Sequence, residues 1–129
     1  MEILFLTVEE VLVIHRDQTT RYGGSLELRD RGLLESALAM PSSSFGGAFL
    51  HRDLFEMAAA YLYHLVQNRP FVDGNKRVGA ATADVFLQLN GYEIDASSEE
   101  YEQLVLSVAR GEIEKNQIAD FIARHAAKT

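Results

Sequence analysis

The sequence contains no cysteine and only two prolines among its 129 residues. The absence of cysteine excludes disulfide frameworks, thiolate metal sites and cysteine nucleophiles. No apolar run approaches the roughly 18 residues that a membrane span needs. The N-terminal stretch also carries acids where a signal peptide carries lysines and arginines. We therefore expect a cytoplasmic protein that folds as one domain over residues 1–129.

Positive charge is also scarce, with 12 Lys and Arg against 19 Asp and Glu and a formal net charge of −7. This balance argues against direct binding to nucleic acid or to anionic membranes, whose phosphates attract a cationic surface. One local exception stands out, because Arg69, Lys76 and Arg77 fall within nine residues. That cluster is compatible with a phosphate site on an otherwise acidic protein.

Capping signals and apolar spacing predict an all-α fold, a compact bundle of about six helices. Thr7-Val8-Glu9-Glu10 and Ser97-Ser98-Glu99-Glu100 are capping boxes, and Asp30 and Asp53 precede apolar patterns of helical period. The expected helices run from about 8 to 20, from Asp30 to Leu38, from Asp53 to Asn68, from Lys76 to Leu89, from Ser97 to Gly111 and from 115 to 127.

Two finer expectations concern packing. In the fourth helix the spacing places Val78, Ala81, Val85 and Leu89 on the buried face. Residues 92–95 are expected to form a short strand that pairs with residues 3–6.

The segment 41–52 contains two adjacent glycines and two phenylalanines, and it is predicted to be a loop. The simpler interpretation is a connector whose Phe45 and Phe49 pack onto the core. The functional interpretation is a flap beside a binding site.

The stretch Arg69-Pro70-Phe71-Val72-Asp73-Gly74-Asn75-Lys76-Arg77 has the chemistry of an anion site. Gly74 lets the backbone turn and approach a ligand, and the helix that follows points free amides at whatever lies above the turn. Lys76 and Arg77 add full charges. Asp73 suits Mg²⁺, which binds phosphates together with few protein carboxylates. Phe71 is expected to anchor the loop by burying its ring.

The same residues also fit ordinary turn chemistry, in which Asp73 or Asn75 caps the next helix. Cations in a first helical turn are electrostatically unfavourable, which favours a bound anion there. The spacing by itself leaves both interpretations open.

The segment resembles the signature of the Fic/Doc superfamily, His-x-Phe-x-Asp-Gly-Asn-(Gly or Lys)-Arg, in the form with lysine that marks death-on-curing (Doc) toxins. Further stretches resemble the family in the same order along the chain: Leu6-Thr7-Val8-Glu9-Glu10, Arg21-Tyr22-Gly23-Gly24, Gly32-Leu33-Leu34-Glu35-Ser36-Ala37-Leu38, Phe45-Gly46-Gly47 and Leu89-Asn90-Gly91-Tyr92. The resemblance therefore covers nearly the whole chain.

The resemblance implies a toxin of a toxin–antitoxin pair that transfers phosphate from ATP to elongation factor Tu, with Mg²⁺ as cofactor and a Phd-like antitoxin as partner. It implies that Asp73 is the magnesium-linked acid, that Gly74 and Asn75 form the anion-holding turn and that Arg77 binds phosphate. Lys76 would separate phosphate transfer from the nucleotidyl transfer of other Fic proteins. The loop at 41–52 would be the flap that docks the target.

Position 69 departs from the family pattern, because the first motif residue there is histidine, the general base. A guanidinium stays protonated at physiological pH and offers no lone pair for a proton. General-base catalysis contributes about 10² to 10⁴-fold, so Arg69 should greatly impair transfer. Arg69 is either an inactivating change in a catalytic toxin or a native residue of a binding-only homologue.

No histidine in the sequence replaces that base. His64 lies five residues earlier, which places it about 140° around the helix from position 69, and we expect it to be a partly buried helix residue. His15, His51 and His125 carry no motif context and are expected to be surface or packing residues. No glutamate is followed by glycine or asparagine, so the family's self-inhibitory motif is not found, and restraint would come from the antitoxin.

Overall fold

Six helices carry most of the chain in the computed structural model, which describes residues 2–129. They are α1 (Val8–Tyr22), α2 (Arg31–Ala39), α3 (Leu54–Asn68), α4 (Asn75–Leu89), α5 (Ser98–Ala109) and α6 (Lys115–His125). Two short antiparallel strand pairs complete the described residues: β1 (Ser44–Phe45) with β2 (Ala48–Phe49), and β3 (Tyr92–Ile94) with β4 (Ala126–Lys128). The predicted all-α fold is confirmed. Within this range no helix is both long and apolar enough to cross a membrane.

The helix starts follow from the capping residues in the sequence. The side chains of Thr7, Asp30, Asp53 and Ser97 each accept a hydrogen bond from the backbone amide three residues later. Each satisfies one of the amides that a helix start leaves free. The four predicted starts are confirmed for this local reason.

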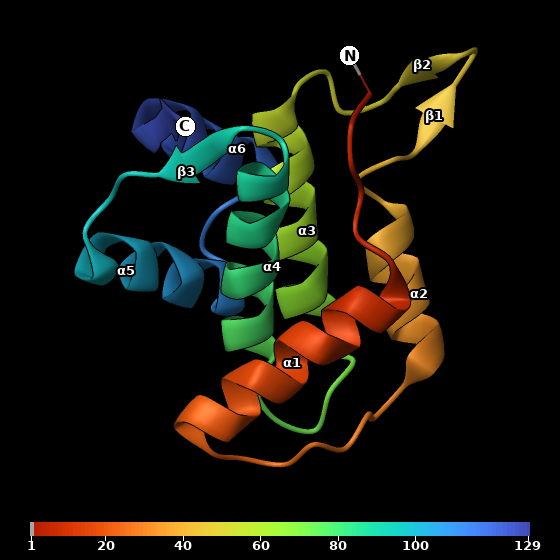
Figure 1. Cartoon of the computed structure of the whole chain (residues 1–129), viewed down its shortest axis with the longest axis vertical. Helices are drawn as coiled ribbons and strands as arrows, with labels where there is room; N and C mark the ends of the chain where they lie inside the picture. Colours follow the sequence, from red (N-terminus) through yellow and green to blue (C-terminus); the bar gives the residue numbers. More distant parts are fainter. Residues whose placement is uncertain (1) are drawn as a thin grey trace.

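The antiparallel pair α3 and α4 forms the centre of the molecule, with α1 crossing its foot, α2 on one side and α5 and α6 on the other (Figure 1). The largest fully buried side chains include Tyr61 on α3, Phe86 on α4 and Phe71 in the turn between them. At the contact of α3 with α4, a Cβ on Gly79 would lie 2.8 Å from a methyl carbon of Val66. Because Gly79 has no side chain, the two helices pack closely near the turn at residues 69–77.

The buried face of α4 is wider and rotated compared with the prediction. Val78 is buried, but Ala81 and Val85 are only half-buried and Leu89 is 45% exposed. The buried residues are Val78, Gly79, Thr82, Ala83, Phe86 and Leu87. Gly79 faces α3, and the small or polar side chains of Gly79 and Thr82 are not identified as core positions by a purely apolar pattern.

The predicted strand at 92–95 exists as β3, but its predicted partner was wrong. β3 pairs with β4, so α6 ends at His125 and not at 127. Residues 3–6 are held by side chains: Leu4 exchanges two 3.0 Å hydrogen bonds with the Asn90 amide. The backbone amide of Leu6 donates to the Tyr61 hydroxyl at 2.9 Å. The predicted partner was wrong because β4, which pairs with β3 instead, lies at the far end of the chain and local sequence patterns do not show that it is close in space.

The segment 41–52 is a small hairpin that projects from the helices (Figure 1). The Phe45 ring is 82% exposed, so the prediction that it packs onto the core was wrong. Phe49 is 43% exposed and contacts Phe5, with ring centroids 5.6 Å apart. The two-residue strands face solvent on both sides, which leaves Phe45 no apolar surface to cover.

Candidate functional site: a cationic turn between two central helices

The turn at residues 69–77, which the sequence predicts to bind an anion, begins where α3 ends; it is called the anion turn below. Arg69 has a left-handed backbone with φ of 49°, a conformation that stops a helix. The Arg29 side chain donates to the carbonyls of Arg69 at 2.7 Å and Asn68 at 2.9 Å. These bonds satisfy carbonyls that the helix end leaves free, and they fix the point from which the turn departs.

Residues 25–30, which follow α1, are hydrogen-bonded to the turn. The amides of Arg29 and Asp30 both donate to the Pro70 carbonyl, at 2.8 and 3.0 Å, and the Val72 amide donates to Glu27 at 3.1 Å. The amide of Ser25 donates to Asp73 Oδ2 at 3.1 Å. The backbone of the turn is therefore fixed by an extended segment alongside it, and the turn is not a free loop.

His15 on α1 also fixes the turn. Its ring is 2% exposed and stacks on Phe71, with centroids 3.7 Å apart and planes at 7°. Its Nε2 lies 2.8 Å from the backbone oxygen of Asp73, and because a carbonyl only accepts, Nε2 is the donor. Phe71 is 1% exposed, which confirms that its ring anchors the loop.

No side chain caps the start of α4. The N-cap residue is Gly74, with φ of 80° and no side-chain cap hydrogen bond. The Asn75 side chain turns back instead, accepting from the Phe71 amide at 3.0 Å and donating to the Phe71 carbonyl at 2.9 Å. The alternative in which Asp73 or Asn75 caps the helix was wrong. The free amides and the positive end of α4 face the space above the turn.

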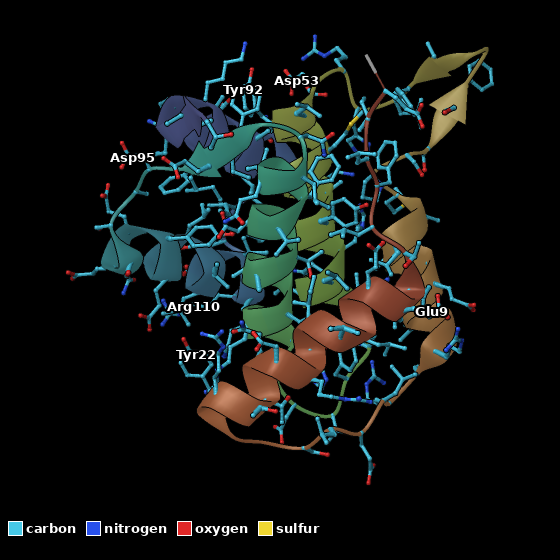
Figure 2. The ribbon with its side chains drawn as sticks, in the orientation of Figure 1. Glu9, Tyr22, Asp53, Tyr92, Asp95 and Arg110 are labelled. Carbon is cyan, nitrogen blue, oxygen red and sulfur yellow. The ribbon has the colours of Figure 1, made fainter. Side chains whose placement is uncertain are left out.

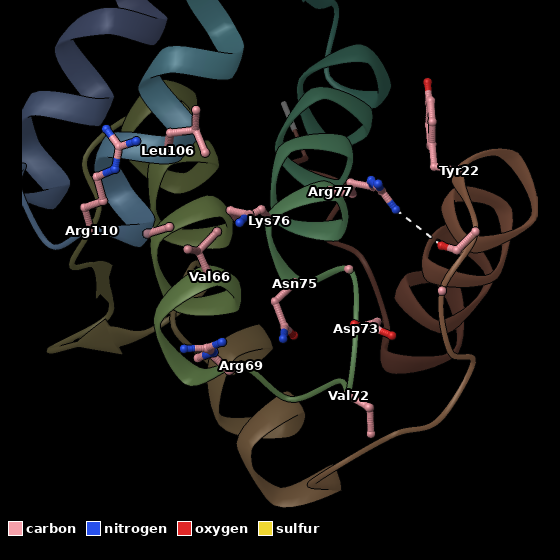
Figure 3. Close-up of a pocket in the computed structure, with 14 residues that line it drawn as sticks. Tyr22, Val66, Arg69, Val72, Asp73, Asn75, Lys76, Arg77, Leu106 and Arg110 are labelled. Carbon is pink, nitrogen blue, oxygen red and sulfur yellow. Dashed lines mark hydrogen bonds between the residues drawn. The ribbon is translucent and has the colours of Figure 1, made fainter.

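That space is a cavity of about 720 Å³, which is in the range of small-molecule sites. All six residues predicted for the site line it, namely Arg69, Asp73, Gly74, Asn75, Lys76 and Arg77. Figure 3 shows the lining side chains from Tyr22 at the end of α1 on the right to Arg110 on the left, with the start of α4 between them. The remaining lining residues are Tyr22, Gly23, Gly24, Val66, Val72, Leu106, Ala109 and Arg110.

Two of the charged groups already have defined contacts. The Arg77 guanidinium donates to the Gly23 carbonyl at 3.3 Å and lies 5.2 Å from the centre of the Tyr22 ring (Figure 3). Asp73 is solvent-exposed, and only its Oδ2 receives the Ser25 amide. Residues 2–129 contain no group of three or more His, Asp or Glu that could hold a metal. A single carboxylate beside a phosphate site fits Mg²⁺, which keeps most of its ligands as water and phosphate.

None of the four histidines lines the cavity. His64 is half-buried, as predicted, and its Nε2 accepts from Lys115 Nζ at 3.0 Å. Burial, reinforced by the nearby Lys115 ammonium, lowers the pKa of His64 to about 4. His15 is committed to the Asp73 carbonyl. The described residues therefore place no imidazole base at the cavity.

Sequence reasoning missed two residues of this site. His15 was assigned no motif context, although its position in the apolar pattern of α1 signalled burial. Arg110 gave no signal at all, because it follows α5, 33 residues after Arg77 in the sequence. Figure 2 shows Tyr22 and Arg110 at the ends of their helices, and both line the cavity.

Comparison with known proteins gives consistent matches. A sequence model of the Fic/DOC family matches residues 5–87. The chain is 38% identical over 108 residues to the toxin Doc of Mycolicibacterium smegmatis, which covers 82% of this chain and 83% of that protein. It is 31% identical over 119 residues to the protein kinase doc of Escherichia phage P1, covering 92% of this chain and 93% of that protein.

Proposed function

Since the chain belongs to the Fic/DOC family, we propose that it is a Doc-type toxin of a toxin–antitoxin pair, built for phosphate transfer from ATP to a hydroxyl of elongation factor Tu. Arg69 impairs this transfer. The observation that carries the proposal is the uncapped start of α4, whose first turn holds Lys76 and Arg77 and no acid. Such a turn is unfavourable without an anion above it.

The residues divide the work as follows. The α4 amides and Arg77 bind phosphate oxygens, since a helix start and a guanidinium fork both suit that geometry. Lys76 adds charge on the same turn. Asp73 would hold Mg²⁺, which supplies charge neutralisation when the nucleotide is bound. Gly74 and the two hydrogen bonds between the Asn75 side chain and the Phe71 backbone fix the conformation of the turn, which leaves the first amides of α4 uncapped.

The missing element is a proton acceptor for the target hydroxyl. Arg69 cannot accept a proton, and none of the described histidines reaches the cavity. We therefore propose that the chain binds nucleotide but transfers phosphate about 10² to 10⁴-fold more slowly than a form with histidine at position 69. Histidine also tolerates the left-handed backbone that position 69 requires.

The decisive experiment measures transfer from labelled ATP to elongation factor Tu with the unchanged chain, which carries Arg69, and with Arg69→His. Label that appears with Arg69→His, and disappears again in Arg69→His combined with Asp73→Ala, supports the proposal. Label with neither form, while both forms bind ATP, contradicts it. The mass of the labelled product separates added phosphate from an added nucleotide, the outcome that Lys76 disfavours.

A second function follows from the same Arg69 observation: a binding-only homologue that captures a Phd-like antitoxin without chemistry. The two functions differ in one result, because the binding module takes up the antitoxin but gains no transfer on Arg69→His. The exposed hairpin with Phe45 supports a docking role for residues 41–52 in the catalytic alternative. A target in translation would place the protein in the cytoplasm.

A further inference from the structure

The cavity reverses the charge balance of the protein. Four of the 12 Lys and Arg residues of the chain line it, namely Arg69, Lys76, Arg77 and Arg110, whereas one of the 19 acids, Asp73, does so in residues 2–129. Positive charges gathered at one cavity repel each other. A protein of net charge −7 has an excess of acidic side chains that could pair with these cations, but only one acid lines the cavity. The arrangement indicates a ligand with several negative charges.

Within residues 2–129, none of these four cations forms an ion pair with a carboxylate. The basic members of the ion pairs within residues 2–129 are other side chains, namely Arg21, Arg31, Arg52 and His125. Arg77 is held by Gly23 and Tyr22. Arg69, Lys76 and Arg110 are solvent-exposed, so their charges are free to meet a ligand.

Arg110 lies outside the stretch 5–87 that the family model matches. It is the C-cap residue of α5, and Figure 3 shows it on the side of the cavity opposite Tyr22. A cation at the end of a helix is favourable by itself. Arg124 in the last turn of α6 has that same advantage, but Arg124 does not line the cavity. Arg110 thus shares a helix end with Arg124 but differs from it in lining the cavity, while the Arg124 side chain donates to the Asp120 carbonyl of its own helix at 3.3 Å.

We propose that Arg110, together with Arg69 and Lys76, forms a second anion-binding wall, so that the cavity holds a chain of linked phosphates and not a single phosphate. The first phosphate contacts come from the α4 start and Arg77, and Arg110 adds contacts from α5. A guanidinium grips two phosphate oxygens at once, which suits a polyphosphate better than a carboxylate peptide of lower charge density. The inference rests on the proposed nucleotide site and adds a specificity residue from a different part of the chain.

The test is calorimetric titration of the full chain with three probes in the presence of Mg²⁺: ATP, inorganic tripolyphosphate and AMP. Arg110→Ala is expected to lower the affinity for ATP and for tripolyphosphate about tenfold, as the loss of one charge-assisted contact does. AMP, with one phosphate, should change less than twofold. Arg110→Lys should recover part of the affinity, because the charge remains and the planar fork is lost.

Arg124→Ala is the matched control, because it removes another exposed arginine from a helix end, one that does not line the cavity. It should leave all three affinities within about twofold. Circular dichroism confirms that each variant keeps its helices. The salt dependence gives an independent readout, since a lost phosphate contact lowers the slope of log affinity against log salt in Arg110→Ala but not in Arg124→Ala.

The outcomes separate this inference from the proposed function. If ATP binds the unchanged chain and Arg110→Ala equally well, the second wall is wrong and the nucleotide site stands. If tripolyphosphate binds through Arg110 but ATP does not bind, the wall is right and the nucleotide function is wrong. If the unchanged chain binds neither ATP nor tripolyphosphate, both are wrong.

Discussion

The Nε2–H group of His15 donates a 2.8 Å hydrogen bond to the backbone carbonyl of Asp73, 58 residues later in the chain. The ring also lies flat on Phe71, and a Cβ on Gly74 would approach its Nε2 to 3.5 Å. One buried side chain on α1 therefore contacts the turn at Phe71, Asp73 and Gly74. This couples the shape of the turn at 69–77 to the packing of α1.

Replacing His15 should affect both stability and binding. His15→Leu keeps an apolar side chain against Phe71 but leaves the Asp73 carbonyl without its donor. We expect the free energy of unfolding to fall by about 1–3 kcal/mol and ATP to bind more weakly, because the turn is less well fixed. Urea denaturation and calorimetric titration measure the two effects.

His125 provides the matched control for this change. Its Nδ1 donates to the Phe121 carbonyl at 2.8 Å and its ring stacks on Phe121 at 4.1 Å, both within α6. His125→Leu should lower stability without changing ATP affinity. Equal ATP affinity in the two variants would show that His15 does not position the turn.

Arg69→Gly should stabilise the protein. The left-handed backbone at position 69 disfavours a side chain by about 1 kcal/mol, and glycine relieves this strain. The control is Arg110→Gly, where φ is −82° and glycine gives no such relief. A midpoint of thermal unfolding that rises for Arg69→Gly and not for Arg110→Gly meets the expectation; equal shifts would contradict it.

Stability should decline as the pH falls from about 6.5 to about 4. The pKa of His64 is about 4 in the folded protein, lowered first by burial and then by Lys115, whereas an unfolded histidine titrates near 6.5. The unfolded state thus binds the proton first in this window, and stability is lost with acid. Because the ring is half-exposed, solvent screening limits the loss to about 1–2 kcal/mol.

His64→Gln isolates this contribution, since a glutamine oxygen can still accept from Lys115. The decline of unfolding free energy between pH 6.5 and 4 should be shallower in the variant. It does not vanish, because burial also lowers the pKa of His51. Equally steep declines in the two proteins would refute the role of His64.

Gly79→Ala should destabilise the protein although alanine is the better helix former. The added Cβ would lie 2.8 Å from Val66 Cγ2 and 3.3 Å from the Leu62 carbonyl oxygen, and such overpacking costs about 1–3 kcal/mol. A double-mutant cycle with Val66→Ala tests the cause. The two changes together should cost less than their sum, because the second removes the clashing methyl; strict additivity would exclude the clash.

The sequence by itself determined the helices, four of their starts and which residues gather in the turn at 69–77, because each depends on residues close together in the chain. Thr7, Asp30, Asp53 and Ser97 cap amides three residues away, and the motif at 69–77 is continuous. Tertiary structure decided the rest. It paired β3 with the far C-terminus, left Phe45 in solvent, brought His15 of α1 to the turn and placed Arg110, at the end of α5, beside the cavity. Such contacts join distant segments whose proximity depends on how whole helices pack, and no local pattern records that packing.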